Sequence, residues 1–298
     1  MEVSHMKAIH SPMRIAFLIF DYLILVMIGF ICLAPMWHTL CASFSSPQAL
    51  AASKGMLLLP KGEFTLKGYK IVFSNMSIWK SYLNTLLYVV GGTVLGIIMT
   101  ALGAYTLSRK YFLPAGTLML FISFTMLFNG GLIPNYILIQ KLGLLNNRLA
   151  LILPTAISVF NLVILRTSFQ GIPDSLEESA KLDGANDMQI FVRIVLPLSK
   201  ASLAVIILFI AVMHWNSWFS ASLYLTSRSK YPLQIILREI LVDGNTNITS
   251  AGADASISIY KTLIKYCTVI VATLPILAIY PFIQKYFTKG VMIGAIKG

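Results

Sequence analysis

Four carboxylates are gathered in one short stretch of this 298-residue chain, SLEESAKLDGANDMQIFVRIVLP at residues 175–197. The chain has eleven acidic residues in all, and the four in this stretch are Glu177, Glu178, Asp183 and Asp187. Clustered carboxylates suit either acid–base catalysis or binding to a cationic partner. Catalysis needs a companion base or a metal-ligand set, and the stretch offers neither. The pattern therefore favours binding to a partner.

The same stretch predicts two short helices with a bend between them. Ser175 and Glu178 fit a capping box at the start of the first helix. Gly184 tolerates the left-handed conformation that ends a helix, and Asn186 with Gln189 fits a second start. The second helix has apolar residues at helical spacing and a proline at its end: Phe191, Ile194, Val195, Leu198 and Pro197.

Helices this short are marginal in water because helix nucleation is costly, so the pair needs a surface to lie on. A helix in the plane of a membrane carries Lys and Arg on its polar face. The first helix instead carries Glu177 and Glu178 side by side. Anionic lipid headgroups would repel these side chains, and the charges therefore favour a basic groove on another protein over the membrane plane.

Long apolar blocks flank the acidic stretch. Hydrophobic residues make up 57% of the chain and charged residues 11%, against roughly a quarter charged in soluble domains. A bilayer core is crossed by about twenty apolar residues, and six such blocks are present: Ile15–Trp37, Tyr82–Ser108, Phe112–Ile133, Leu149–Phe169, Leu203–Phe219 and Tyr266–Phe287. We expect an all-α polytopic membrane protein whose first block is retained as a span, with the helix–turn–helix between spans four and five.

Other classes of site are disfavoured. The net charge of +12 is spread over every loop, which indicates contact with lipid headgroups rather than nucleic acid. The three cysteines (Cys32, Cys41 and Cys267) lack metal-ligand spacing and are expected to be buried free thiols. Gly91 and Gly96 are followed by two isoleucines where a phosphate-binding loop needs Gly-Lys. If ATP drives this protein, another chain must bind the nucleotide.

The second apolar block carries a stripe of small residues. They recur every four positions, at Gly92, Gly96, Thr100 and Ala104. Small side chains at this spacing let the backbone of another helix approach closely. The stripe therefore predicts a helix-packing surface.

The spacing within the acidic stretch resembles the EAA loop of permease subunits of binding-protein-dependent ABC importers. That pattern is Glu-Ala-Ala, three residues, Gly, nine residues, Ile, one residue and Leu-Pro. Six of its seven fixed positions match, with Ser179 in place of the first alanine. The matching residues are Glu178, Ala180, Gly184, Ile194, Leu196 and Pro197.

Four further segments are similar to the sugar-importer branch of this family, and most of all to its polysaccharide-type permeases found in Gram-positive bacteria. They are residues 128–134, 141–146, 166–173 and 284–298. The resemblance implies one transmembrane domain over residues 1–298, with core spans at roughly 80–288, a coupling loop at 170–201 and a tail at 289–298. Lys and Arg are shared almost equally between the two sets of loops, so the positive-inside rule leaves the orientation open. The resemblance implies that both termini and the coupling loop are cytoplasmic.

The resemblance further implies that the coupling loop docks in a cleft of an ATPase subunit. Glu178 would pair with a basic residue there, Gly184 would supply the bend, and Phe191 and Ile194 would fill an apolar floor. The tail at 289–298 is a second candidate contact. The full set of docking candidates is Glu177, Glu178, Ser179, Ala180, Asp183, Gly184, Ala185, Phe191, Ile194, Leu196 and Pro197.

The implied partners are a second homologous permease chain, two ATPase subunits that hold ATP and Mg²⁺, an extracellular sugar-binding lipoprotein and membrane lipid. No cofactor is expected on this chain, which is a transport subunit rather than an enzyme. The implied cargo is a carbohydrate, with an oligosaccharide or polysaccharide fragment, including an acidic one, as the candidate. A permease for a non-sugar solute and a secondary transporter are the alternatives, and the second would need intramembrane acids for ion coupling.

Candidates for the sugar pathway are amide and aromatic residues inside the apolar blocks: Asn129, Asn161, Trp215, Asn216 and Trp218. Amides and aromatic rings suit sugar hydroxyl groups and ring faces, and polar groups in a membrane usually face the bundle interior. The same amides can instead hydrogen-bond between helices, so both interpretations stay open. His214 has no companion at ligand spacing, which favours packing over metal binding.

Overall fold

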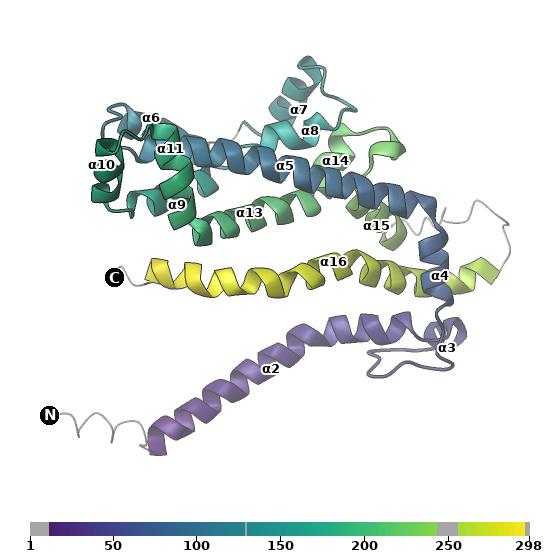
Figure 1. Ribbon diagram of the computed structural model, residues 1–298. Coiled ribbons are helices and arrows are strands. Elements are labelled where there is room, and N and C mark those ends of the chain that lie inside the picture. Colours follow the sequence, from purple (N-terminus) through teal and green to yellow (C-terminus); the bar gives the residue numbers. More distant parts are fainter. Residues whose placement is uncertain (1–11, 129, 243–255, 296–298) are drawn as a thin grey trace. The chain divides into compact units, whose positions relative to one another are not determined.

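The computed structural model describes residues 12–128, 130–242 and 256–295, and every regular element in these ranges is helical (Figure 1). The elements before the acidic stretch are α2 (Pro12–Ser43), α3 (Pro47–Ala51), α4 (Lys67–Ser74), α5 (Met76–Ser108), α6 (Ala115–Leu127), α7 (Leu132–Lys141), α8 (Leu149–Ile152), η2 (Leu153–Thr155) and α9 (Val159–Gln170). Those from the acidic stretch onward are α10 (Asp174–Leu182), α11 (Asp187–Ile190), η3 (Phe191–Val195), α12 (Leu196–Leu198), α13 (Lys200–Trp215), α14 (Trp218–Tyr224), η4 (Arg228–Lys230), α15 (Leu233–Leu241) and α16 (Ser256–Ala295).

The number of possible membrane spans agrees with the sequence. Three helices are each long and apolar enough to cross a membrane: Met13–Ser43, Met76–Ser108 and Tyr260–Ile279. Three bent helix pairs bring the number to six when each pair is counted as one span. The expected all-α polytopic architecture is therefore confirmed. Spans three to five are bent helix pairs rather than single straight helices.

Local sequence explains these breaks. Leu149–Thr155 and Val159–Gln170 differ in direction by 47°, because Pro154 lacks a backbone donor and Ser158 caps a new helix start. Gly131 has a φ of +88° just before α7, a conformation that suits glycine. The helix Lys200–Trp215 turns by 84° from Asp187–Leu198 at Ser199, so the fifth span starts earlier than expected and does not reach Phe219 as one helix.

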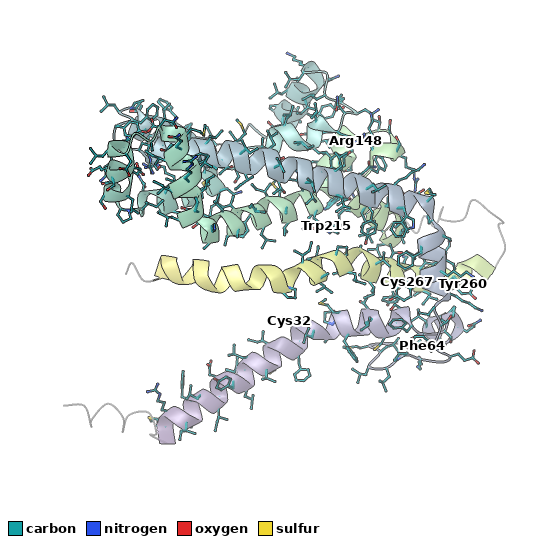
Figure 2. All side chains as sticks on the ribbon, in the orientation of Figure 1. Cys32, Phe64, Arg148, Trp215, Tyr260 and Cys267 are labelled. Carbon is teal, nitrogen blue, oxygen red and sulfur yellow. The ribbon has the colours of Figure 1, made fainter. Side chains whose placement is uncertain are left out.

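The described residues form two compact units. The first comprises the described parts of Met1–Ser74 and Thr246–Ala272, and the second those of Asn75–Asn245 and Thr273–Gly298. In the first unit Cys267 packs against Gly68, and its thiol donates to the Ser43 carbonyl at 3.4 Å. Cys41 and Cys267 are buried free thiols, as expected, whereas Cys32 is exposed on α2 (Figure 2).

Helix α5 is the central element of the second unit and packs against α9 and α13. The small-residue stripe faces α13, because a Cβ atom built on Gly92 would lie 2.0 Å from Nε2 of His214. One turn further along, a Cβ atom on Gly96 would lie 3.2 Å from the Ile210 side chain. Thr100 and Ala104 complete the stripe and are fully buried. The predicted close helix contact is confirmed, with His214 as a packing residue.

The contact between α5 and α13 predicts a strong effect of one added methyl group. Gly92→Ala should cost about 1–3 kcal/mol of stability, because the His214 ring must move within a packed interior. Thermal unfolding in detergent measures this, and His214→Ala should relieve most of the cost in the double variant. Gly116→Ala is the matched control, since nothing lies within 4 Å of a Cβ atom there. An unchanged melting temperature for Gly92→Ala would contradict the packing described.

Candidate coupling site

The first helix of the acidic stretch, α10, begins two residues earlier than expected. Pro173 is the N-cap residue with an extended ψ of 131°, and Asp174 is the first helical residue. Ser175 therefore lies inside the helix, so the predicted capping box of Ser175 and Glu178 is wrong. Asp174 and Glu177 supply negative charge to the first turn, which the helix dipole favours.

The bend after α10 is built as the sequence predicts. Gly184 has a φ of +80°. Its amide donates to the Lys181 carbonyl at 3.0 Å, and the Ala185 amide donates to the Ala180 carbonyl at 2.9 Å. These two bonds form a Schellman motif, which satisfies the last carbonyls of the helix. A non-glycine residue at this position would be strained.

The second helix starts with the predicted capping box. Asn186 accepts from the Gln189 amide at 2.8 Å, and the Gln189 side chain accepts from the Asn186 amide at 2.9 Å. The helix continues through α11, the π-helical turn η3 and α12 as far as Leu198. Pro197 lies in the last turn, directly after η3. Proline has no backbone N–H to donate, and a π turn next to it is one of the irregularities by which a helix accommodates the missing hydrogen bond.

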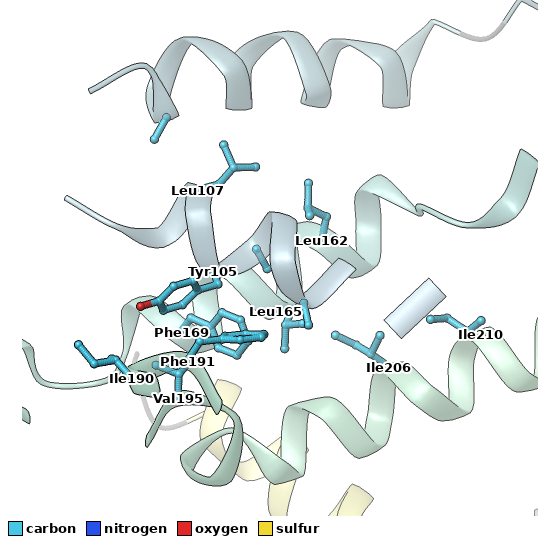
Figure 3. Close-up of a cluster of buried hydrophobic side chains, with 13 residues drawn as sticks. Tyr105, Leu107, Leu162, Leu165, Phe169, Ile190, Phe191, Val195, Ile206 and Ile210 are labelled. Atoms are coloured by element: carbon cyan, nitrogen blue, oxygen red, sulfur yellow. The ribbon is translucent and has the colours of Figure 1, made fainter. Parts of the chain in front are cut away.

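One face of this helix pair is anchored in the core of the second unit. Ile190, Phe191 and Val195 are each at most 6% exposed and pack with residues of α5 and α9 (Figure 3). The rings of Phe191 and Tyr105 are 4.9 Å apart. The apolar spacing therefore serves packing within the chain at these positions.

The short loop that follows α5 binds α10 through charge. Arg109 forms an ion pair with Glu177, and Lys110 forms one with Asp174. The Lys181 ammonium lies 4.4 Å from the centroid of the Tyr111 ring. Partial burial and the neighbouring Asp187 carboxylate raise the pKa of the Tyr111 hydroxyl, which therefore stays neutral at physiological pH. Three consecutive loop residues thus contact α10 at positions 174, 177 and 181, which share one helix face.

Other residues of α10 are open to solvent. Glu178, Ser179 and Asp183 are exposed. Leu182 lies beside them at the end of the helix and is 90% exposed. The exposed part of α10 therefore combines an apolar side chain with carboxylates.

The expected docking residues therefore fall into groups. Glu178, Ser179, Asp183, Gly184 and Pro197 are exposed, and Ala180, Ala185, Ile194 and Leu196 are partly exposed. The four partly exposed residues pack against the core of this chain, Phe191 is buried in it, and Glu177 is ion-paired with Arg109. Leu182 and Arg109 are not among the residues expected from the sequence. The place of Leu182 at the end of a mostly polar helix is a signal for it, whereas nothing in the sequence pairs Arg109 with residue 177.

The pathway candidates of the second unit differ in their surroundings. Asn161 is 6% exposed on α9. Trp215, labelled in Figure 2, is also 6% exposed, and its indole N–H has no hydrogen-bond partner among the described residues. Asn216 donates to the Val212 carbonyl of its own helix at 3.0 Å. The Trp218 ring is covered by the Arg238 guanidinium at 4.3 Å.

A cavity of about 210 Å³ lies beside these residues on α13 and α14. It is lined by Leu151, Thr155, Met213, His214, Asn216, Ser217, Phe219 and Ser220. Asn216 alone among the pathway candidates lines it. Asn129 lies outside the described residues, and so do the last three residues of the tail at 289–298, which is otherwise part of α16. Within the described ranges no three His, Cys, Asp or Glu side chains are grouped to hold a metal ion.

Comparisons with known proteins agree with the motif and the fold. Residues 92–293 match the family described as the binding-protein-dependent transport system inner membrane component. The chain is 43% identical over 288 residues to the polygalacturonan/rhamnogalacturonan transport system permease protein YtcP of Bacillus subtilis, covering 94% of this chain and 99% of that protein. It is 40% identical over 271 residues to protein LplC of the same organism, covering 91% of each.

A solved structure has the same fold. It is a chain of a bacterial ABC transporter involved in the import of the acidic polysaccharide alginate, with a TM-score of 0.85 and 31% identity. The match covers 93% of this chain and 99% of that one. The chain therefore belongs to the family of binding-protein-dependent transport system inner membrane components, multi-pass permease subunits of ABC transporters.

Proposed function

We propose that this permease imports an acidic oligosaccharide or polysaccharide fragment, and that the helix pair α10–α11 docks it to separate ATPase subunits. The observation that carries the docking proposal is the contrast between neighbouring residues of α10. Asp174 and Glu177 are bound to the chain by ion pairs, whereas Glu178 and Leu182 are exposed and lack such a pair among the described residues. A short helix that is anchored to its own chain and still has exposed side chains is well suited to bind a partner.

The chemistry of the open face indicates what the partner offers. Leu182 is an apolar anchor, and an anchor gains most when a partner pocket removes it from water. Glu178 stands one helical turn before it, so a basic residue at the rim of such a pocket complements the pair. We therefore assign an apolar socket with a cationic edge to the ATPase subunit. The residues that fill the socket are Leu182 and the exposed parts of the loop around Gly184, rather than Phe191.

The energetic role of docking follows from population shift. A partner moves an equilibrium only through its different affinity for the two states. Closure of two ATPase subunits around ATP and Mg²⁺ would draw the docked helix pairs together and favour an outward-open permease, and hydrolysis would reset it. In this arrangement the helix pair and both termini are cytoplasmic. The end of α16 and the tail at 289–298 are a second place for ATPase contact.

The substrate class rests on the relatives. YtcP is named for polygalacturonan and rhamnogalacturonan, and the solved neighbour serves alginate import. The complete importer would add a second related permease and an extracellular sugar-binding lipoprotein.

Reversing the charge of Glu178 tests the docking proposal. Glu178→Arg should weaken ATPase binding by about 2 kcal/mol, roughly thirtyfold, because it places a cation against a cationic rim. Uptake in liposomes should fall with it, while the melting temperature of the isolated permease stays unchanged. Glu63→Arg makes the same change at an exposed acid of the other unit and should leave binding intact. Normal ATPase binding by Glu178→Arg would refute the docking role.

The substrate proposal has its own test. The permease is reconstituted with its ATPase subunits and with a sugar-binding protein of the importer. Oligogalacturonides should stimulate ATP hydrolysis well above the rate seen with neutral gluco-oligosaccharides of the same length. Equal or greater stimulation by the neutral sugar would contradict an acidic substrate while leaving the docking site untouched.

A further inference from the structure

The end of α5 holds both helices of the acidic stretch. Its last turns and the residue that follows supply Tyr105, Ser108 and Arg109. Arg109 pairs with Glu177 of α10. Tyr105 donates to the Asp187 carbonyl of α11 at 3.2 Å and packs against Phe191. The helix pair is therefore attached at two points to a single transmembrane helix.

The Arg109–Glu177 pair differs in its surroundings from the neighbouring pair. The side chains of Arg109 and Glu177 are 6% and 12% exposed, whereas those of Lys110 and Asp174 are 83% and 59% exposed. Buried ion pairs resist separation, because each charge that is left alone keeps its desolvation cost. Exposed pairs add little. Of these two contacts, the Arg109–Glu177 pair is therefore the one that resists separation of α10 from the end of α5.

Arg109 is itself held in place from the side of α5. Its guanidinium lies 4.6 Å from the centroid of the Tyr105 ring. It also donates to the Ser108 hydroxyl, at 3.1 Å from Nε and 2.9 Å from one terminal nitrogen. The planar guanidinium thus makes a cation–π contact with Tyr105, hydrogen bonds to Ser108 and an ion pair with Glu177. A lysine would not reproduce this combination. Arg109 is rigidly part of α5 and at the same time paired with α10.

We infer that Arg109 is a positioning residue that transmits movement of α10 to α5, with Glu177 as its counterpart rather than a residue that touches the ATPase. This inference rests on the docking proposed above and assigns Glu177 and Glu178 separate tasks. Glu178 is exposed and is left for the ATPase, whereas Glu177 is less exposed and pairs with Arg109 at the end of α5. Movement of the docked helix then reaches a membrane span through a buried ion pair.

The test compares two matched pairs of variants in the full transporter reconstituted in liposomes. Arg109→Met and Glu177→Gln break the buried pair, and Glu177→Gln keeps the side-chain shape. Lys110→Met and Asp174→Asn remove the same charges from the exposed pair. We measure three quantities: ATPase binding to the permease, the ATP hydrolysed per sugar transported, and the melting temperature of the permease.

Breaking the buried pair should leave ATPase binding near the wild-type value and raise the ATP used per sugar about tenfold, because removal of a residue that links two sites changes their coupling by a factor of this order. The control variants should keep the wild-type ratio. The charge-swapped double variant Arg109→Glu/Glu177→Arg should use less ATP per sugar than Arg109→Glu alone.

Two results would overturn the inference. One is an unchanged ATP-to-sugar ratio in Glu177→Gln. The other is a loss of ATPase binding in Glu177→Gln as large as that in Glu178→Arg, because Glu177 would then belong to the docking surface. If the wild-type permease itself does not bind the ATPase, the proposed function fails, whereas normal coupling in Glu177→Gln with an intact wild type removes only this inference.

Discussion

The close approach of α13 to α5 is the constraint on which the second unit depends. A glycine at position 92 leaves room for the His214 ring, and the stripe continues through Gly96 to the buried Ala104. Between helices in a membrane, association relies on close packing rather than on the expulsion of water, so small residues decide where helices meet. The same stripe leads to the end of α5, where Tyr105 and Arg109 hold the acidic helix pair.

The helix pair combines rigidity with accessibility. Its inner side shares a core with α5 and α9 through Phe191 and Val195, and its outer side presents Glu178 and Leu182. A loop with only the outer side would be too flexible to transmit force, since helices of this length are marginal alone. The bend at Gly184 lets about twenty residues have both a buried inner side and an exposed outer side, because the two hydrogen bonds of the Schellman motif fix the angle of the bend.

Much of this arrangement is predictable from local sequence. The second capping box, the glycine bend and the stripe on α5 each depend on neighbouring residues, and each is present. Two local effects of proline were not foreseen: Pro173 precedes the observed start of α10, and Pro154 lies near the break in the fourth span. The pairing of Arg109 with Glu177, by contrast, joins residues 68 positions apart, and no local pattern predicts it. Two adjacent glutamates look alike in a sequence, and only the fold assigns one to the interior and the other to the surface.

Hydrogen–deuterium exchange of the permease, with and without its ATPase subunits, tests the central claim most directly. Exchange is slowed where a partner covers backbone that otherwise opens locally. Binding should slow exchange in peptides that cover residues 176–186, while peptides from the loop at 226–231 should remain unchanged. Unaltered exchange at 176–186 in a complex shown to be assembled would mean that the acidic helix pair is not where the ATPase binds.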